Sequence, residues 1–172
     1  MGDIDERVKR NVNQQRFLPI DPQAMNDPLS KLIFDYEQSN EQFQDRELLD
    51  LIQRVEKNNP ERSVKAPLFV SKLLTHRTAA IRKSAFAACL NILSHPQRSP
   101  RRILLDAYRG ALCNSNHQVA QYAITLLPQF VDACPEEANM LIKFGSIAYN
   151  RLPAPSTEIE MHISRAFTKA SQ

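Results

Sequence analysis

The chain has 172 residues, of which 42% are hydrophobic and 24% are charged, and its formal net charge is +3. This composition predicts one folded domain with a buried core, and charges or prolines interrupt every apolar run before it reaches the length of a membrane span. Only three glycines occur, which excludes the glycine clusters of phosphate-binding loops and dinucleotide-binding turns.

The first 60 residues divide into an arm and a helical hairpin. Residues 1–26 are polar and weakly periodic, so we expect an N-terminal arm that is partly disordered or docks elsewhere. Within 27–60, apolar residues recur with the helical period, and Asp27-Pro28 is a typical helix start. The helical domain is therefore predicted to span 27–172, and 27–60 is its first hairpin.

From residue 65 onward, one apolar spacing occurs three times at an interval of about 40 residues. Each stripe has apolar residues 4, 8 and 11 positions after its first: Ile81, Ala85, Cys89, Ile92; Val119, Ala123, Leu127, Phe130; Ile159, Ile163, Phe167, Ala170. A shorter apolar helix precedes each stripe. The spacing therefore predicts further hairpins at about 65–97, 99–133 and 135–172.

Several residues qualify this segmentation. Pro128 is expected to kink or end its helix, because proline lacks the backbone N–H that a helix interior needs. Gly110 and Gly145 fall within predicted helices, and close contact between helices would explain their presence. Thr157 and Glu160 have the spacing of a capping box at the start of the last helix.

The fold class follows from how such hairpins can bury their apolar stripes. A two-helix unit is too thin to shelter its stripe alone, so neighbouring units must cover one another. No stretch alternates long enough for a strand. The segment "AAIRKSAFAACLNIL" also resembles the second helix of a HEAT repeat, through Ile81, Arg82, Ala85 and Leu90. We therefore predict an all-α fold, an α-solenoid of stacked helical hairpins of the HEAT/armadillo kind.

The last helix is expected to close this stack. It combines Ile159, Met161, Ile163 and Phe167 with charged residues such as Glu160. Such a mixture predicts a terminal cap with a polar outer face and an apolar inner face.

The thiols and imidazoles do not form a recognisable reactive or metal-binding pattern. Cys89, Cys113 and Cys134 are odd in number and include no CxxC pair, so we expect buried, reduced thiols in an intracellular compartment. The four histidines show no zinc-ligand spacing. Cys113 and His117 form the only nucleophile–base spacing, and Cys113 is expected to be buried. We therefore predict a protein that is not an enzyme and holds no metal, cofactor or small molecule.

Charge is distributed unevenly along the chain. Residues 1–64 carry a net charge of −4, whereas residues 65–172 carry +7. The candidate partner-binding residues are the basic side chains between positions 72 and 109, and they are expected at the rim of the fold: Lys72, Arg77, Arg82, Lys83, Arg98, Arg101, Arg102 and Arg109. Three interpretations remain open, namely a solvated face, a face for an acidic protein or for the chain's own N-terminal segment, and a nucleic-acid-binding face without interleaved aromatic residues.

A narrower resemblance lies near the end of the chain. The segment "LLPQFVDACPEEANMLIKFGSIAYNRLPAPSTEIEMHISRAF" is similar to the C-terminal region of the Integrator complex subunit 1 family. The matching positions are Leu126, Leu127, Pro128, Phe130, Cys134, Glu137, Ala138, Leu141, Phe144, Pro155, Ile159 and Ile163. Members of that family are far longer than 172 residues.

The Integrator resemblance implies a function that composition and spacing alone do not give. It implies a nuclear, non-catalytic scaffold that binds other subunits of the complex and acts in small nuclear RNA 3′-end processing and RNA polymerase II transcription. Two alternatives remain at this point. One is a HEAT/armadillo adaptor in transport or trafficking, and the other is a helical repeat that binds nucleic acid, including RNA, through the basic 72–109 face.

Overall fold

A computed structural model describes residues 28–39, 43–57, 65–95, 101–154 and 156–171. Within these ranges, the chain forms helices joined by turns and contains no strand. The prediction of an all-α fold is therefore confirmed. The helices are α3 (Pro28–Gln38), α4 (Asp45–Lys57), α5 (Ala66–Leu73), α6 (Ala79–Leu93), α7 (Arg101–Leu112), α8 (His117–Thr125), α9 (Leu127–Ala133), the 3-10 helix η2 (Pro135–Glu137), α10 (Ala138–Arg151) and α11 (Thr157–Ala170).

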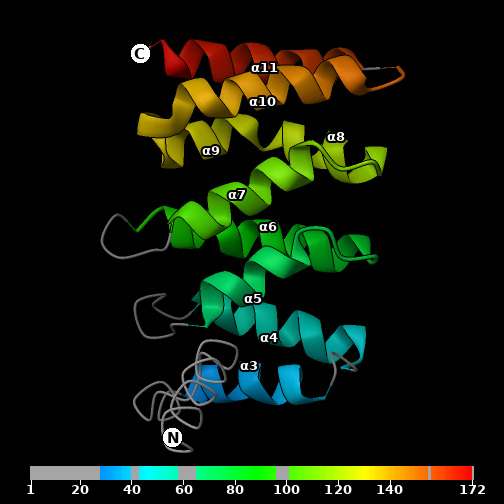
Figure 1. Cartoon of the computed structure of the whole chain (residues 1–172), viewed down its shortest axis with the longest axis vertical. Coiled ribbons are helices and arrows are strands. Elements are labelled where there is room, and N and C mark those ends of the chain that lie inside the picture. Colours follow the sequence, from blue (N-terminus) through cyan, green and yellow to red (C-terminus); the bar gives the residue numbers. More distant parts are fainter. Residues whose placement is uncertain (1–27, 40–42, 58–64, 96–100, 155, 172) are drawn as a thin grey trace, which may run out of the picture.

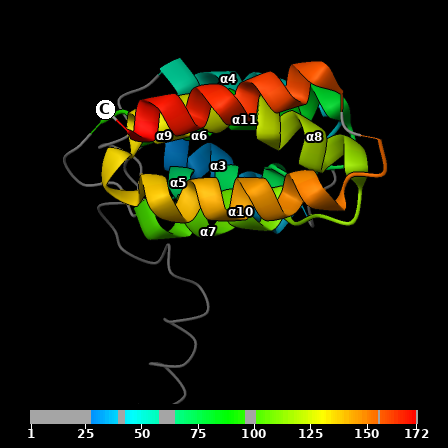
Figure 2. The ribbon, with the colours of Figure 1, turned by 90° about the horizontal axis from the view of Figure 1, so that it is seen from above.

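The helices lie in two layers along an elongated molecule (Figures 1 and 2). In one layer α3 contacts α5, α5 contacts α7 and α7 contacts α10. In the other layer α4 contacts α6, α6 contacts α9, and both α8 and α9 contact α11. Contacts such as those of α5 with α6 and α10 with α11 join the layers. Each helix therefore buries its apolar face against neighbours both within its layer and across it.

The described helices fall within the predicted hairpin ranges. The ranges 27–60, 65–97, 99–133 and 135–172 contain α3–α4, α5–α6, α7–α9 and α10–α11. The predicted arm, residues 1–26, and the predicted helix start at Asp27 lie outside the described residues. None of the helices in the described ranges combines the length and the apolar character that a membrane crossing requires.

Pro128 divides the second helix of the third hairpin, as its sequence predicts. Helix α8 ends at Thr125, and α9 begins at Leu127 with Pro128 in its first turn. In the first turn of a helix the backbone N–H groups have no intrahelical acceptor. Proline, which lacks an N–H, therefore loses no hydrogen bond at this position. As a result, α9 packs on α6 and α8 packs on α7, while both contact α10 and α11.

The start of α11 corrects the capping prediction. The side chain of Ser156, not Thr157, accepts a hydrogen bond from the backbone N–H of Ile159 at 3.3 Å. Glu158 and Glu160 lie in the first turn, where negative charge interacts favourably with the helix dipole. Helix α8 begins similarly, because the Asn116 side chain accepts from the N–H of Gln118 at 3.0 Å.

The core is continuous from α3 to α11 and contains an aromatic cluster at its centre. The ring of Tyr108 stacks on that of Phe130, with centroids 3.6 Å apart, and meets Phe86 edge to face. The buried hydroxyl of Tyr108 donates a hydrogen bond to the carbonyl of Ala123 at 2.7 Å. This contact satisfies a polar group in the core at the last turn of α8 before the break at Pro128.

Candidate interaction surface

Where the structure describes them, the basic residues predicted to bind a partner fall into separate local groups. Seven of them lie in the described part of the chain, whereas Arg98 lies outside it. Lys72 and Arg77 line one surface hollow, and Arg82 and Lys83 line another. The remaining three belong to α7. The structure therefore separates these residues into local groups with different surroundings.

The hollow that contains Lys72 and Arg77, here called the α3–α5 hollow, has a volume of about 370 Å³. It lies between α3, α4, α5 and the turn that joins α5 to α6. Its lining combines aromatic, aliphatic and charged side chains: Tyr36, Glu37, Phe43, Asp45, Leu48, Leu68, Phe69, Lys72, Leu73, His76 and Arg77. The mixture can accommodate a group that is partly apolar and partly charged.

The placement of Arg82 at an exposed rim is wrong. Arg82 is only 7% exposed, and its guanidinium donates hydrogen bonds to the carbonyls of His76 and Arg77 at 2.8 and 3.1 Å. A buried arginine must satisfy its donors within the protein, and the preceding turn provides the acceptors. Arg82 therefore fixes the α5–α6 turn and is not accessible to a partner.

Lys83 lies in the second hollow, also about 370 Å³, which α6, α8 and the start of α11 enclose. Its ammonium is 5.7 Å from the centre of the Tyr122 ring. Gln118, Gln121 and Thr125 add uncharged polar groups to the lining. Burial raises the pKa of Tyr122. This hollow has a single exposed cation over an aromatic ring and is less basic than the sequence alone suggests.

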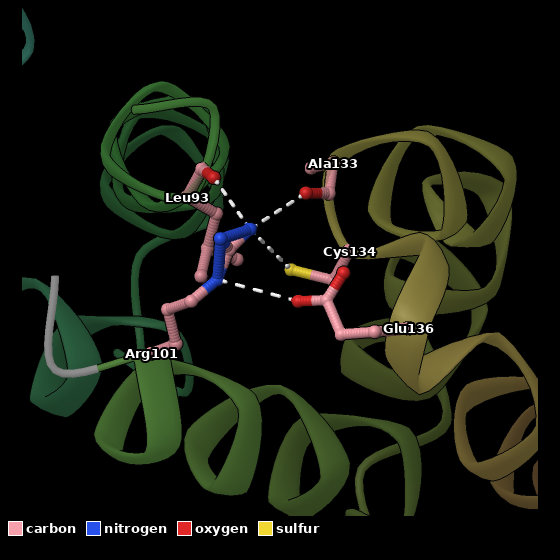
Figure 3. A network of polar contacts seen from close by, with 5 residues as sticks. All are labelled: Leu93, Arg101, Ala133, Cys134 and Glu136. Carbon is pink, nitrogen blue, oxygen red and sulfur yellow. Dashed lines mark hydrogen bonds and ion pairs between the residues drawn. The ribbon is translucent and has the colours of Figure 1, made fainter. Parts of the chain in front are cut away.

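Arg101 is occupied by contacts within the chain (Figure 3). One terminal nitrogen donates to the carbonyls of Leu93 at 3.1 Å and Ala133 at 2.8 Å, and it lies 3.5 Å from the sulfur of Cys134. Its Nε lies 3.5 Å from a carboxylate oxygen of Glu136. Because carbonyls at helix ends lack intrahelical donors, Arg101 joins the ends of α6 and α9 to the start of α7.

Arg102 and Arg109 lie on α7 on either side of Asp106. Asp106 forms ion pairs with Arg102 at 3.6 Å and with Arg109 at 3.4 Å. The Arg102 side chain is 85% exposed, whereas the guanidinium of Arg109 lies 4.3 Å from the centre of the Phe144 ring. Arg102 is therefore a solvated cation, and Arg109 contributes to the contact between α7 and α10.

The outer side of α11 differs from the predicted polar face. Ile159 is buried and Ile163 is half-buried, but Met161 and Phe167 are 49% and 50% exposed. Helix α11 has α8 and α9 beside it in its layer, and within the described residues no helix covers its other side. The prediction that all four apolar residues face inward is therefore wrong for Met161 and Phe167.

The three cysteines differ in how far they are buried. Cys89 and Cys134 are buried. Burial raises the pKa of both thiols, and it raises that of Cys89 well above its usual range. Cys113 is half-buried rather than buried, and His117 is exposed at the start of α8. The described ranges contain no group of three acidic, histidine or cysteine side chains that could hold a metal ion.

The residues that sequence reasoning missed are the aromatic ones. Tyr36, Phe43 and Phe69 meet edge to face at the α3–α5 hollow, with centroids 5.2 and 5.5 Å apart. They come from three separate segments, and a single sequence carries no signal that pairs residues so far apart. The sequence shows the adjacent pair Leu68-Phe69, but only the structure shows that Leu68 is exposed and Phe69 is buried.

Comparisons with protein-family models, with curated proteins and with solved structures give no match to the chain.

Proposed function

We propose that the helices form an α-solenoid of HEAT/armadillo-like hairpins. The contacts that support this proposal run from each hairpin to the next, through α3, α5, α7 and α10 in one layer and α4, α6, α9 and α11 in the other. In such an array each hairpin buries its apolar face against the neighbouring hairpins. Arg82, at the HEAT-like arginine position, braces the turn of its own hairpin.

The chain then serves as a non-catalytic scaffold that binds other proteins. The observation that carries this proposal is that Met161 and Phe167 of α11 are 49% and 50% exposed. Large apolar side chains that share an exposed helix are typical of protein-binding surfaces. A partner could bury apolar surface against these two side chains. Neighbouring charged residues such as Glu160 and Arg165 would then orient it.

Within this class, we propose a subunit of the nuclear Integrator complex, which acts in small nuclear RNA 3′-end processing and RNA polymerase II transcription. The support is the resemblance of residues 126–167 to the C-terminal region of the subunit 1 family. Several matching positions are buried in the α9–α11 core, including Leu127, Phe130 and Leu141. The resemblance therefore includes residues that form the core between the last two hairpins, α7–α9 and α10–α11. The proposed partners are other Integrator subunits.

The alternatives have less support. Binding of nucleic acid through the 72–109 face requires a continuous positive surface, but Arg82 is buried and Arg101 is engaged within the chain. A transport or trafficking adaptor would use the same fold with a different partner, so the identity of the captured proteins separates it from the Integrator proposal.

The test is affinity capture of the tagged full-length chain from nuclear extract, followed by mass spectrometry. We expect Integrator subunits to be enriched, and the double substitution Met161→Asp/Phe167→Asp to reduce their recovery. Arg102→Glu, at an exposed position on α7, changes the net charge by the same amount and is the control. Enrichment of transport factors without Integrator subunits would favour the adaptor alternative and contradict the Integrator proposal.

A further inference from the structure

The α3–α5 hollow combines an apolar floor with an unbalanced positive rim. We infer that it binds an acidic segment of a partner protein, in which an apolar side chain enters the hollow and flanking carboxylates meet Lys72 and Arg77. This inference rests on the proposed scaffold function and names a second contact surface, separate from the outer side of α11.

The floor is suited to an apolar side chain. The rings of Tyr36, Phe43 and Phe69 form a packed edge-to-face group, and Leu68 at the edge of the hollow is 42% exposed. An aliphatic or aromatic side chain placed here would remove Leu68 and the half-buried Phe43 ring from water. Burial of apolar surface is the main source of binding free energy in such contacts.

The acidic residues of the lining already have partners. Both carboxylate oxygens of Glu37 accept hydrogen bonds at 2.9 Å from the ammonium of Lys65, which is itself nearly buried. Asp45 accepts a hydrogen bond at 2.7 Å from the hydroxyl of Thr78 and lies in the first turn of α4, where the helix dipole favours a negative charge. These carboxylates are therefore engaged within the fold.

The cations of the lining are not balanced in this way. Lys72 and Arg77 are exposed, and within the described residues neither forms an ion pair. Their charge is available to a ligand, and complementary charge at an interface rim increases the rate of association and selects the partner. Carboxylates on either side of an apolar anchor have the complementary sign.

The site is held in its shape before any partner arrives. Arg82 fixes the carbonyls of His76 and Arg77, and the N–H of Thr78 donates to the Nδ1 atom of His76 at 3.1 Å. The Thr78–Asp45 hydrogen bond joins this turn to α4. A site that is ordered in advance loses little conformational entropy when a ligand binds.

A peptide fits these features better than a nucleic acid does. The hollow presents only two available cations, whereas Glu37 and Asp45 lie in the same lining. A phosphate backbone would gain little from two charges. The aromatic edges are packed against each other and offer no open face for a stacked base.

The direct test uses synthetic peptides with the full-length chain. The probe is a fluorescein-labelled peptide in which a Phe-Leu pair is flanked by Asp and Glu. One control peptide replaces Phe-Leu with Ser-Gly, and another replaces the acids with Lys. Fluorescence anisotropy gives the affinity, and changes in the ¹⁵N–¹H spectrum locate the contact. We expect saturable binding of the first peptide alone, with shifts at residues such as Phe69, Leu73 and Arg77.

Two variants decide the role of the rim. Lys72→Glu/Arg77→Glu should weaken binding by about tenfold, because both attractive charges become repulsive. Arg102→Glu reverses a single exposed charge outside the hollow, on α7, and should leave the affinity unchanged. Higher salt should weaken binding of the acidic peptide to the wild type, as expected for exposed charges.

Several outcomes would overturn the inference. These are absence of saturable binding, shifts that map to another surface, undiminished affinity of the Lys72/Arg77 double variant, and tighter binding of the Lys peptide or of oligouridylate RNA. A dimer in sedimentation that the double substitution dissociates would assign the hollow to a second copy of the chain and overturn it as well.

The capture experiment keeps this inference distinct from the proposed function. If wild type and the Lys72/Arg77 double variant recover Integrator subunits equally and the peptide does not bind, the scaffold proposal stands and the hollow is not a docking site. If the acidic peptide binds at the hollow but wild type recovers no Integrator subunits, the docking site stands and the Integrator proposal fails.

Discussion

Gly145 of α10 lies directly against Leu127 of α9. A Cβ atom at position 145 would be 2.5 Å from the Cδ2 atom of Leu127, and Leu127 is fully buried. The absence of a side chain therefore allows these two helices to approach closely, as the sequence predicts for Gly145. The same prediction is wrong for Gly110, since a Cβ atom there would meet nothing within 4 Å.

The two glycines provide a matched pair of substitutions. Gly110→Ala should raise the free energy of unfolding by up to about 1 kcal/mol, because alanine has the higher helix propensity and the site has space. Gly145→Ala should gain the same propensity but force Leu127 to move in a filled core, with a net loss of about 1 kcal/mol. Denaturant unfolding of both variants measures the difference. Equal stabilisation by both substitutions would show that Leu127 can move away at no cost.

Arg101 is expected to stabilise the chain far more than its neighbour Arg102. Arg101→Met removes the donor shared by the Leu93 and Ala133 carbonyls, and we expect a loss of about 2 kcal/mol because partly buried carbonyls lose a charged partner. Arg102→Met, at an 85% exposed position, should change the stability by less than about 0.5 kcal/mol. Thermal unfolding of the two variants tests this contrast, and similar melting temperatures would contradict it.

The sequence predicts the helices well here, because the apolar periodicity of a helix is visible within its own segment of the sequence. The stripe of Ile81, Ala85, Cys89 and Ile92 is buried as predicted. The stripe in α11 has identical spacing, yet Phe167 is exposed. Spacing identifies a shared helix face, but burial also requires a neighbour to cover it. Helix α6 has α4 on one side and α9 on the other, whereas among the described helices α11 has neighbours on one side only.

The interaction surface was less predictable, because contacts with residues far along the chain decide whether a basic side chain is buried, paired or exposed. Arg101 and Arg102 are adjacent and chemically identical, but only Arg101 reaches Ala133 and Glu136. Arg82 is buried because its turn presents two carbonyls to it. The sequence therefore identifies which residues are basic, and the tertiary contacts decide which of them remain available.

The hydroxyl of Tyr108 should stabilise the break between α8 and α9. Tyr108→Phe keeps the ring stack on Phe130 but removes the 2.7 Å hydrogen bond to Ala123. We expect a loss of about 1 kcal/mol, since the Ala123 carbonyl also accepts from the N–H of Leu126 and keeps that partner. Tyr149→Phe, at a half-buried ring on α10, is the control. If Tyr108→Phe left the free energy of unfolding unchanged, the buried hydroxyl would make no net contribution to stability.

Stability should fall as the pH rises into the alkaline range. Burial raises the pKa of the Cys89 thiol far above the 9.0 of an exposed thiol and raises that of Tyr108 well above 10.0. Folding therefore favours the neutral forms of both groups. The unfolded chain releases their protons near pH 9 and 10, whereas the folded chain retains them, so the free energy of unfolding decreases with pH by up to about 1.4 kcal/mol per unit for each group.

Cys89→Ala isolates one part of this dependence. Alanine leaves a small space in the core, which changes the stability equally at every pH. We therefore expect the variant to be less stable than wild type at pH 7 but to lose less stability between pH 7 and 10.5, because one proton fewer is released on unfolding. Urea unfolding of each protein at both pH values, with its own pH 7 value as reference, measures the two slopes. Parallel slopes would contradict the prediction, since they would mean that Cys89 ionises as readily in the folded chain as in the unfolded one.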